Sequence, residues 1–355
     1  MTILQISAFA AKTAGNFIPS LLALQHKNEE LGHTTIYAFP QRAKDQDWCK
    51  ELEQSNKVYY LPEKHARILP TTYKTIKSII KSNKVDIVHS HFELYDIPTK
   101  VVCKNNTRVF WHLHDTIEDN YNKSKFSRKL LYKLQYGFFK KRVKLLTVSE
   151  RHSNFAVKLG FDKDSVIYVP NAIDKSRLNF IEDAKYDKHF LMFGWDVYRK
   201  GVDLAINAAN SIDNISFPFL IIGQEDSKRY VEQYSSNPNV MHSFPTEKVD
   251  LLYASARAFL HVSRAEGFSY ALLEAIYSGT PVICSDIPEN QFAREFEGII
   301  WIKNGDAQAL KEALDLILES NYKNSPDIIK RNRQLIEKKY SLNSWCEQIS
   351  SIYYE

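Results

Sequence analysis

Short apolar runs rich in β-branched residues alternate along the chain with longer stretches whose apolar residues recur at helical spacing. In the first half, these runs predict strands at residues 2–6, 34–38, 58–61, 86–89, 108–111, 144–148 and 165–169. In the second half, they predict strands at residues 189–193, 217–222, 239–242, 258–262, 281–284 and 298–302. Helical spacing is clear at residues 73–81, 202–211 and 307–320. Because repeated strand–helix alternation builds parallel sheets with right-handed crossovers, we predict the α/β class.

The pattern restarts near His189, after a polar stretch at residues 174–188. A chain of 355 residues is long enough for about two domains. We therefore predict two Rossmann-like, doubly wound domains facing a cleft, comprising residues 1–172 and residues 173–341. Ligands of such sheets bind beyond the carboxyl ends of the strands, so residues that directly follow a strand are the first candidates for function.

The composition is that of an ordinary globular protein, with 44% hydrophobic and 25% charged residues. This balance argues against a disordered chain, a collagen or a coiled coil. No apolar run reaches the ~20 residues that a membrane-spanning helix needs, and the first residues lack the features of a signal peptide. The four cysteines have no CxxC spacing, which favours reduced thiols in a cytoplasmic protein; they are Cys49, Cys103, Cys284 and Cys346.

Charge divides the chain into a basic half and an acidic half. Residues 1–180 carry a formal charge of +12, and residues 181–355 carry −7. Residues 123–144 hold nine Lys or Arg and no acid, interleaved with Phe126, Leu130, Leu131, Leu134, Phe138 and Phe139. We predict a crossover helix there, with its apolar face on the sheet and a basic outer side that suits an anionic membrane surface. RNA is the competing partner, but the chain shows no nucleic-acid-binding module, so we expect no nucleic acid.

The most informative segment follows the predicted strand at residues 258–262. It places Glu266 just before a helix, whose free backbone amides favour an anion such as a diphosphate; these amides belong to Gly267, Phe268 and Ser269. Glu274 comes eight residues after Glu266, a little over two helical turns, so both carboxylates are predicted on roughly the same side of the helix. Two carboxylates placed in this way can hold sugar hydroxyls by charge-assisted hydrogen bonds. The competing interpretation is that Glu266 caps the helix and Glu274 is solvated.

This segment resembles the Glu-x7-Glu signature of the retaining glycosyltransferases of family 4 (GT4), which have the GT-B fold. The resemblance extends over nearly the whole chain, because further motifs follow in the family's order. They are the V-P-N-A-I-D stretch at residues 169–174, the loop at residues 193–203, strand ends at residues 86–91 and at His114–Asp115, Gly15, Gly32–His33, and Ser344–Trp345 with Tyr353. The last of these resembles the family's closing helix, so residues 342–355 are predicted to pack back on the first domain.

The resemblance implies a role for each residue of the donor site. Glu274 would bind the ribose hydroxyls of a nucleotide sugar, while Glu266 and the amides of residues 267–269 would bind the donor sugar. Lys200 would neutralise the diphosphate in place of a metal, and Gly15 would lie in the glycine loop beside the donor. A fixed cation suits this position, because it stabilises the charge that develops on a nucleoside diphosphate leaving group. We therefore expect no metal and no cofactor, with Glu266 and Lys200 among the catalytic residues.

One position departs from the family pattern. Trp195 stands where the family has the arginine that partners Lys200. Arg199 could supply the second cation from the position next to Lys200, although it would point elsewhere if the loop begins a helix. Two alternatives stay open: either Arg199 replaces the family arginine, or the site works with one cation.

Four histidines form two His-x-His pairs near the ends of two predicted strands; they are His89, His91, His112 and His114. Period two places the members of each pair on one face of the sheet. Four histidines are compatible with zinc, but no Asp or Cys at ligand spacing accompanies them, so we expect no metal. The resemblance implies that His114 lines the cleft as a third catalytic residue, that His91 assists acceptor binding, and that His89 and His112 are packed core residues. It does not make His114 a general base, since in retaining members of this fold the leaving phosphate is thought to take the acceptor proton.

Other motifs offer little. Two Asp-x-Asp pairs, at residues 45–47 and 162–164, lie in polar, Lys-rich connections and are interpreted as solvated turns. The chain has no G-x-G-x-x-G and no Walker A pattern, so dinucleotide redox chemistry and P-loop chemistry lack support.

We therefore predict a retaining hexosyltransferase with a UDP-linked sugar as its expected donor, and a composition rich in Lys, Asn, Ile and Tyr points to a bacterial source. The expected acceptor is a saccharide or lipid-linked saccharide in surface polysaccharide or glycan assembly, at the inner face of the cell membrane. One alternative is a sugar-nucleotide epimerase on the same fold, which would form product without an acceptor. The other is a catalytically silent partner subunit, which the Trp195 departure favours and the retention of Glu266, Glu274 and Lys200 opposes.

Overall fold

The computed structural model describes residues 1–114, 117–139, 142–178, 188–212, 218–246, 248–320 and 322–355. Asp115, Lys140 and Lys141, which belong to motifs named above, lie outside the described residues, as does part of the polar stretch at residues 174–188. The chain divides into two compact units, the first comprising Met1–Ala172 with Leu342–Glu355 and the second comprising Ile173–Ser341.

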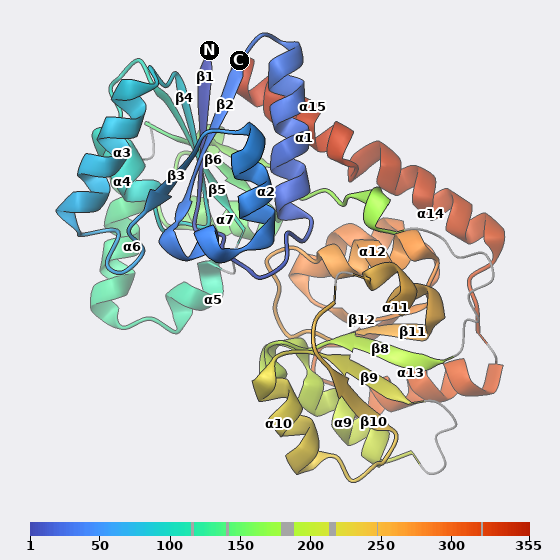
Figure 1. Cartoon of the computed structure of the whole chain (residues 1–355). Coiled ribbons are helices and arrows are strands. Elements are labelled where there is room, and N and C mark those ends of the chain that lie inside the picture. The colour runs from blue at the N-terminus through green and yellow to red at the C-terminus, as the bar shows by residue number, and fades with distance from the viewer. Residues whose placement is uncertain (115–116, 140–141, 179–187, 213–217, 247, 321) are drawn as a thin grey trace. The chain divides into compact units, whose positions relative to one another are not determined.

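The first unit is built on a seven-stranded parallel sheet with the strand order β3-β2-β1-β4-β5-β6-β7. Its strands are β1 (Thr2–Ser7), β2 (Thr34–Pro40), β3 (Val58–Leu61), β4 (Ile87–His91), β5 (Arg108–Leu113), β6 (Lys144–Thr147) and β7 (Val166–Tyr168). Its helices are α1 (Phe17–Glu30), α2 (Asp47–Ser55), α3 (Pro70–Ser82), α4 (Asp96–Val102), α5 (Ile117–Asn122), α6 (Phe126–Phe139), α7 (Glu150–Lys158) and α15 (Leu342–Tyr354). Helices cover both faces of the sheet (Figure 1), which is why its strands are continuous apolar runs in the sequence.

The second unit repeats this plan with a six-stranded parallel sheet in the order β10-β9-β8-β11-β12-β13. Its strands are β8 (His189–Phe193), β9 (Phe219–Ile222), β10 (Val240–Ser243), β11 (Ala256–His261), β12 (Val282–Asp286) and β13 (Ile299–Lys303). Its helices are α8 (Val197–Lys200), α9 (Val202–Asn210), α10 (Glu225–Tyr234), α11 (Val249–Ser255), α12 (Tyr270–Ser278), α13 (Ala307–Ser320) and α14 (Pro326–Lys339). The predicted α/β class with two doubly wound parallel sheets is confirmed.

The strand order of each sheet reverses at one point, between β1 and β4 in the first unit and between β8 and β11 in the second. Loops that leave the carboxyl ends of the strands diverge at such a switch point and leave room for a ligand. In the first unit, Gly15 lies in the loop after β1, and His91 is the last residue of β4. In the second unit, Lys200 follows β8 and Glu266 follows β11. The fold therefore places most of the predicted site residues at the two switch points.

Helix α15 returns the chain to the first unit after the second unit is complete. Its Trp345, Ile349 and Tyr353 share an apolar cluster with Ile3 of β1 and Leu146 of β6. The Tyr353 hydroxyl also accepts a hydrogen bond from the Gln5 side chain at 3.0 Å. Burial of both apolar and polar groups makes α15 an integral layer of the first unit.

The prediction that the apolar residues of segment 123–144 cover the sheet is wrong for most of them, as helix α6 shows. The residues that it buries are Tyr132, Gln135, Tyr136 and Phe139, which form a stripe at helical spacing. Of the six apolar residues expected to cover the sheet, only Phe139 is buried; the others are 49% to 83% exposed, and they are Phe126, Leu130, Leu131, Leu134 and Phe138. The helix has two apolar faces, and the tyrosine-containing face packs on the protein. No helix in the described ranges is long and apolar enough to span a bilayer.

Candidate functional site

The loop between β8 and α9 carries two cations of the predicted donor site. Asp196 caps the short helix α8 by accepting a hydrogen bond from the backbone N–H of Arg199 at 3.0 Å. Gly201 then adopts a φ of +76°, and a Cβ at this position would lie 2.4 Å from the carbonyl oxygen of Val262. Glycine is needed here both for its φ and for this close approach, which holds the loop against the end of β11 and leaves Lys200 buried.

Lys200 and Arg199 converge on Glu266. The Lys200 Nζ lies 2.5 Å from Glu266 Oε1, and the Arg199 Nη1 lies 3.3 Å from Glu266 Oε2. Lys200 and Glu266 are each only 4% exposed, so water barely reaches the pair. Burial alone would raise the pKa of Glu266, but the positive charge around it, chiefly that of Lys200, outweighs burial and lowers the pKa to about 2. Glu266 is therefore a carboxylate at neutral pH and holds both cations in place.

The predicted placement of the two glutamates on one side of a helix is wrong. Helix α12 begins at Tyr270, so Glu266 lies in the preceding loop, and only Glu274 is on the helix. The reason is the Ser269 hydroxyl, which accepts a hydrogen bond from the N–H of Leu272 at 3.2 Å and so caps the helix after Glu266.

An aromatic ring occupies the position of the family arginine. The Lys200 Nζ lies 4.0 Å from the centroid of the Trp195 ring, which is 47% exposed, and this is a cation–π contact. The expectation that Arg199 points elsewhere is also wrong. Helix α8 is a single turn, and Arg199 and Lys200 at its end both reach Glu266.

Glu274 is buried inside the second unit rather than solvated. Its Oε1 lies 2.9 Å from Arg177 Nη1, and its Oε2 accepts a hydrogen bond from the Tyr253 hydroxyl at 3.0 Å. Burial and the charge of Glu274 raise the pKa of Tyr253 well above its usual value, so the hydroxyl stays a donor. Sequence reasoning missed both partners. Arg177 closely follows the V-P-N-A-I-D motif without being part of it, and Tyr253 belongs to no motif.

Gly267, Phe268 and Ser269 lead from Glu266 into α12. The Phe268 ring is buried and stacks on Phe292 with the ring centroids 4.7 Å apart, while the Ser269 hydroxyl is engaged as the cap. These side chains are committed to packing and capping. The backbone amides at the start of α12 are therefore the groups with which this segment can bind an anion.

A further ion pair, which sequence reasoning also missed, holds the two loops together. Arg264 binds Asp203 through two hydrogen bonds of 2.7 Å each, a bidentate arrangement. The backbone N–H of Arg264 also donates to the carbonyl oxygen of Arg199 at 2.7 Å. The loop that carries Glu266 is thus tied to the loop that carries Lys200.

In the first unit, the four histidines form one cluster at the carboxyl ends of β4 and β5. His91 Nδ1 lies 3.1 Å from His114 Nε2, and His91 Nε2 lies 3.0 Å from Gln5 Oε1. Burial, together with the neighbouring rings, lowers the pKa of all four, to about 3 for His89 and well below the usual value for the others. The rings are neutral at pH 7, so His114 can line a site but brings no positive charge to it.

Three of these histidines, His89, His91 and His112, have ring nitrogens within 4.8 Å of one another. The rings of His89 and His112 are stacked, however, with centroids 5.3 Å apart and planes inclined by 4°. A histidine binds a metal through an in-plane lone pair, and stacked rings direct these lone pairs along parallel planes. One ring nitrogen of His89 is also hydrogen-bonded to Tyr353, whose hydroxyl oxygen lies 2.5 Å from Nδ1. This geometry is that of a packed core, and metal independence stays a prediction.

His114 lies beside an unusual loop. After β4, Phe92 has a φ of +63° and Glu93 a φ of +54°, left-handed values that are uncommon outside glycine and frequent at functional sites. The Phe92 ring stacks on His114 with centroids 4.5 Å apart. Gly15, in the loop after β1, has a φ of +58° and open space around its Cβ position, so its backbone conformation is what favours glycine. Sequence reasoning found Gly15 and His114 but missed Phe92.

Two family profiles match the chain. The family described as "Glycosyl transferases group 1" matches residues 175–340, and the family described as "Glycosyltransferase Family 4" matches residues 23–177. The two matches together cover most of both units.

Curated relatives are similar over much of the chain. The chain is 25% identical over 227 residues to the O-antigen chain mannosyltransferase RfbU of Salmonella typhimurium, and the match spans 62% of each protein, less than two thirds of RfbU. It is 23% identical over 291 residues to the alpha-galactosylglucosyldiacylglycerol synthase of Streptococcus pneumoniae, spanning 74% of this chain and 75% of that one.

Solved structures match both units. Anabaena HepE, in complex with UDP and glucose, has a TM-score of 0.80 at 13% identity, covering 100% of this chain and 99% of HepE. WaaG, involved in lipopolysaccharide biosynthesis, has a TM-score of 0.74 at 17% identity and covers 99% of each chain. At these identities the likeness shows a shared fold alone.

Proposed function

The chain belongs to the family 4 glycosyltransferases with the GT-B fold, and from this premise we propose that it transfers a sugar from a UDP-linked donor to a saccharide acceptor with retention of configuration. The observation that carries the proposal is the buried pair of Lys200 and Glu266, with Arg199 beside it, at the switch point of the second unit. The relatives named for O-antigen and glycolipid synthesis, and the neighbour solved with UDP and glucose, support these substrate classes.

Lys200 and Arg199 are assigned to the diphosphate of the donor. Glu266 holds both cations in position before the donor binds, so little rearrangement is needed when charge develops. In the transfer, the bond between the anomeric carbon and the diphosphate oxygen breaks, and the electron pair leaves with the diphosphate. The acceptor hydroxyl oxygen bonds to the anomeric carbon on the same face, and its proton passes to the departing phosphate.

Glu274 is assigned to the ribose of the nucleotide. Arg177 binds one oxygen of Glu274 and the Tyr253 hydroxyl donates to the other, which fixes the carboxylate in position. The amides of Gly267, Phe268 and Ser269 are assigned to the donor sugar or its phosphate. Gly15 is assigned to the donor, His91 to the acceptor, and His114 to the place where the donor sugar and the acceptor meet. The neutral imidazole rings can exchange hydrogen bonds with sugar hydroxyls there.

We propose that the protein acts at an anionic membrane surface. The exposed side of α6 combines Phe126, Leu130, Leu131, Leu134 and Phe138 with the basic residues of the same helix, which are Arg128, Lys129 and Lys133. An amphipathic helix of this composition lies in the headgroup region with its apolar side chains among the acyl chains. A lipid-linked saccharide would be the acceptor presented at such a surface.

The silent-partner alternative is favoured by one observation, the Trp195 ring on Lys200 in place of a second arginine. It differs from the proposal in a measurable way. A silent partner binds UDP without turnover, and an epimerase forms product without an acceptor.

The test is transfer by the purified chain, with a panel of nucleotide sugars first screened by thermal shift, because a ligand raises the melting temperature by mass action. The leading donor is then incubated with saccharide and lipid-linked saccharide acceptors, and the anomeric configuration of the product is read by NMR. We expect a product of retained configuration, with activity that survives EDTA. Inversion, dependence on added magnesium or manganese, or turnover without any acceptor would each overturn the corresponding part of the proposal.

A further inference from the structure

A hollow in the first unit lies away from every residue assigned to the reaction. It has a volume of about 1030 Å³ and is bounded by the end of α4, the start of β5, the end of α6, the start of β6 and the end of α15. Arg108 and Lys144, the first residues of β5 and β6, line it, so it sits at the amino ends of these parallel strands. His112 and His114 lie at the other end of β5. The hollow is therefore separate from the candidate site, and its size is that of a small-molecule site.

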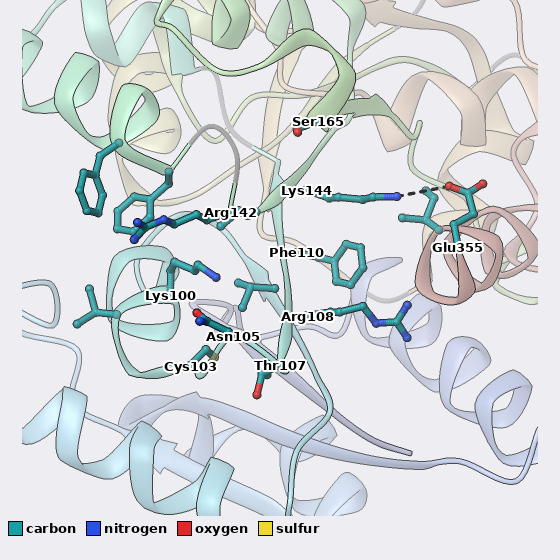
Figure 2. A pocket seen from close by; sticks show the side chains of 16 residues that line it. Lys100, Cys103, Asn105, Thr107, Arg108, Phe110, Arg142, Lys144, Ser165 and Glu355 are labelled. Atoms are coloured by element: carbon teal, nitrogen blue, oxygen red, sulfur yellow. Dashed lines mark hydrogen bonds and ion pairs between the residues drawn. The ribbon is translucent and has the colours of Figure 1, made fainter.

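Positive charge dominates the lining of this hollow. Figure 2 shows Lys100, Arg108, Arg142 and Lys144 around it, with Glu355 as the one acidic side chain among the lining residues. Lys144 is paired with Glu355 at 3.4 Å. Within the described part of the chain, the other three cations make no ion pair with a carboxylate. The lining thus carries a surplus of positive charge that no carboxylate of the described residues balances.

The cations affect one another. Burial lowers the pKa of Lys100, and the nearby charge of Arg142 lowers it further. Like charges gathered at a half-buried position repel, and a bound anion would relieve that repulsion. Cations spread evenly over a surface would show no such mutual effect.

One edge of the hollow is apolar and exposed. Phe138 is 64% exposed and Val101 57% exposed, and both line the hollow. The guanidinium of Arg142 lies 5.1 Å from the centroid of the Phe138 ring. Phe138 is also the last member of the exposed apolar side of α6. The hollow and the side of α6 proposed to enter the membrane are therefore continuous.

We propose that this hollow binds the phosphate headgroup of an anionic phospholipid taken from the bilayer on which α6 lies. The phosphate would sit among Lys100, Arg108 and Arg142, and the acyl chains would leave over Val101 and Phe138. A molecule with a phosphate at one end and an apolar tail at the other matches both parts of the lining. The inference rests on the proposed membrane contact and adds selectivity to it. General attraction between basic residues and an anionic surface does not depend on the structure of the headgroup, whereas binding in a pocket does.

The test compares two variants that lose the same charge. K100Q/R108Q removes two cations from the hollow, and K129Q/K133Q removes two from α6 outside it. Binding is measured by co-sedimentation with vesicles of phosphatidylcholine mixed with phosphatidylglycerol, over a salt series, with phosphatidylcholine vesicles as blank. A second measurement uses calorimetry with dihexanoyl phosphatidylglycerol below its micelle concentration, and with inorganic phosphate. Circular dichroism and melting temperature verify that both variants are folded.

We expect the short-chain lipid to bind wild type and K129Q/K133Q alike, and K100Q/R108Q at least about tenfold more weakly, the change expected for losing one charged hydrogen bond. Inorganic phosphate should bind wild type at least about tenfold more weakly than the lipid, since it lacks the apolar contacts. Equal binding of phosphate and lipid would make the hollow a free-phosphate site and overturn the lipid proposal. Equal loss in both variants would also overturn it. Normal vesicle binding without short-chain lipid binding would leave the membrane contact standing and remove the pocket. Short-chain lipid binding without vesicle binding would do the reverse.

Discussion

Glu266 is the residue on which the proposed donor site depends, because it holds Lys200 in a place that water barely reaches and binds the half-buried Arg199 as well. Such a pair contributes little net stability, since the cost of burying both charges offsets their attraction. Removing one partner alone is costly, because it leaves a charge buried without compensation. The arrangement is therefore better explained by what it prepares, which is a fixed positive charge for a diphosphate, than by stability.

Lys200→Met should lower kcat/KM by about a hundredfold or more, the scale for losing one preorganised charge contact. The stability of the protein should fall as well, because Glu266 then faces only Arg199. The double variant Lys200→Met/Glu266→Gln separates these effects: it should recover stability in urea unfolding while transfer stays slow. Lys248→Met, at an exposed position of the same unit, is the matched control and should behave as wild type.

Near-normal turnover in Lys200→Met would remove the phosphate assignment. A separate variant, Arg199→Ala, tests whether Arg199 replaces the family arginine that is absent at Trp195 or whether the site works with one cation. A loss as large as that of Lys200→Met means that Arg199 replaces the family arginine. A small loss means that Lys200, backed by the Trp195 ring, is sufficient.

Glu274→Gln should weaken UDP binding at least about tenfold, because a charged acceptor for the ribose hydroxyls is lost. Inorganic diphosphate, which has no ribose, should bind this variant as it binds wild type. Isothermal titration with both ligands measures the difference, and the exposed Glu312→Gln serves as control. Equal weakening of both ligands would place Glu274 at the phosphates instead.

Sequence reasoning reaches single residues only where a motif marks them. Glu266, Glu274 and Lys200 are found in this way. Arg177 and Arg264 are not, because an arginine becomes part of the site only through the carboxylate that it meets in the folded chain. Which of several nearby cations meets Glu274 is decided by the path of the loop after Ile173, and no local pattern encodes that path.

At the scale of elements, helix α6 shows where patterning fails. Strands buried on both faces leave one interpretation of an apolar run, so the predicted and observed strands agree closely. A helix with two apolar stripes leaves two interpretations. Tyr132 and Tyr136 bury large ring surfaces in α6, while the leucines remain outside. Counting apolar residues cannot distinguish the stripes, because the choice depends on the shape of the sheet beneath.

Leu130→Ser/Leu134→Ser should therefore weaken binding to anionic vesicles and change stability little, by roughly 0.5 kcal/mol per site or less, as for surface positions. Tyr136→Ser, on the buried face, should instead lower the free energy of unfolding by several kcal/mol (about 3–5), as for the loss of a large core side chain. Vesicle co-sedimentation and urea unfolding measure the two effects. A double variant that unfolds readily, or one that binds vesicles as wild type does, would show that the exposed leucines have another role.

The four buried histidines at the ends of β4 and β5 make the free energy of unfolding depend on pH. Because burial lowers the pKa of these histidines, the unfolded chain binds protons more readily than the folded chain. Their contribution to stability is complete above the unfolded value of about 6.5 and is lost as pH falls below it, by roughly 1.4 kcal/mol per pH unit for each neutral ring. His112→Leu should make urea unfolding less steeply pH-dependent by about one proton below that value. An unchanged slope would mean that His112 is protonated in the folded protein.

For the whole molecule, the division into two parallel-sheet units follows from the alternating pattern and its restart at His189. The family motifs then indicate which switch point carries the residues that we propose to bind the donor. The phospholipid hollow lies beyond both sources of information. Lys100, Arg108 and Arg142 are scattered in sequence and belong to no motif, and only the folded chain brings them to one place.

UDP should therefore affect the molecule unevenly. If the nucleotide is held by Lys200, Arg199 and Glu274, amide hydrogen exchange should slow at the loop before α9, at the loop before α12 and within α12. Binding stabilises only conformations that hold the ligand, so local opening of these segments should become rarer by about a hundredfold at a hundred-fold excess over Kd. The amides around Lys100 and Arg108 should exchange as before, and short-chain phosphatidylglycerol should produce the complementary pattern. Protection by UDP at the hollow would mean that it is a second nucleotide site, and absence of protection around Glu274 would contradict the assignment of the nucleotide to the second unit.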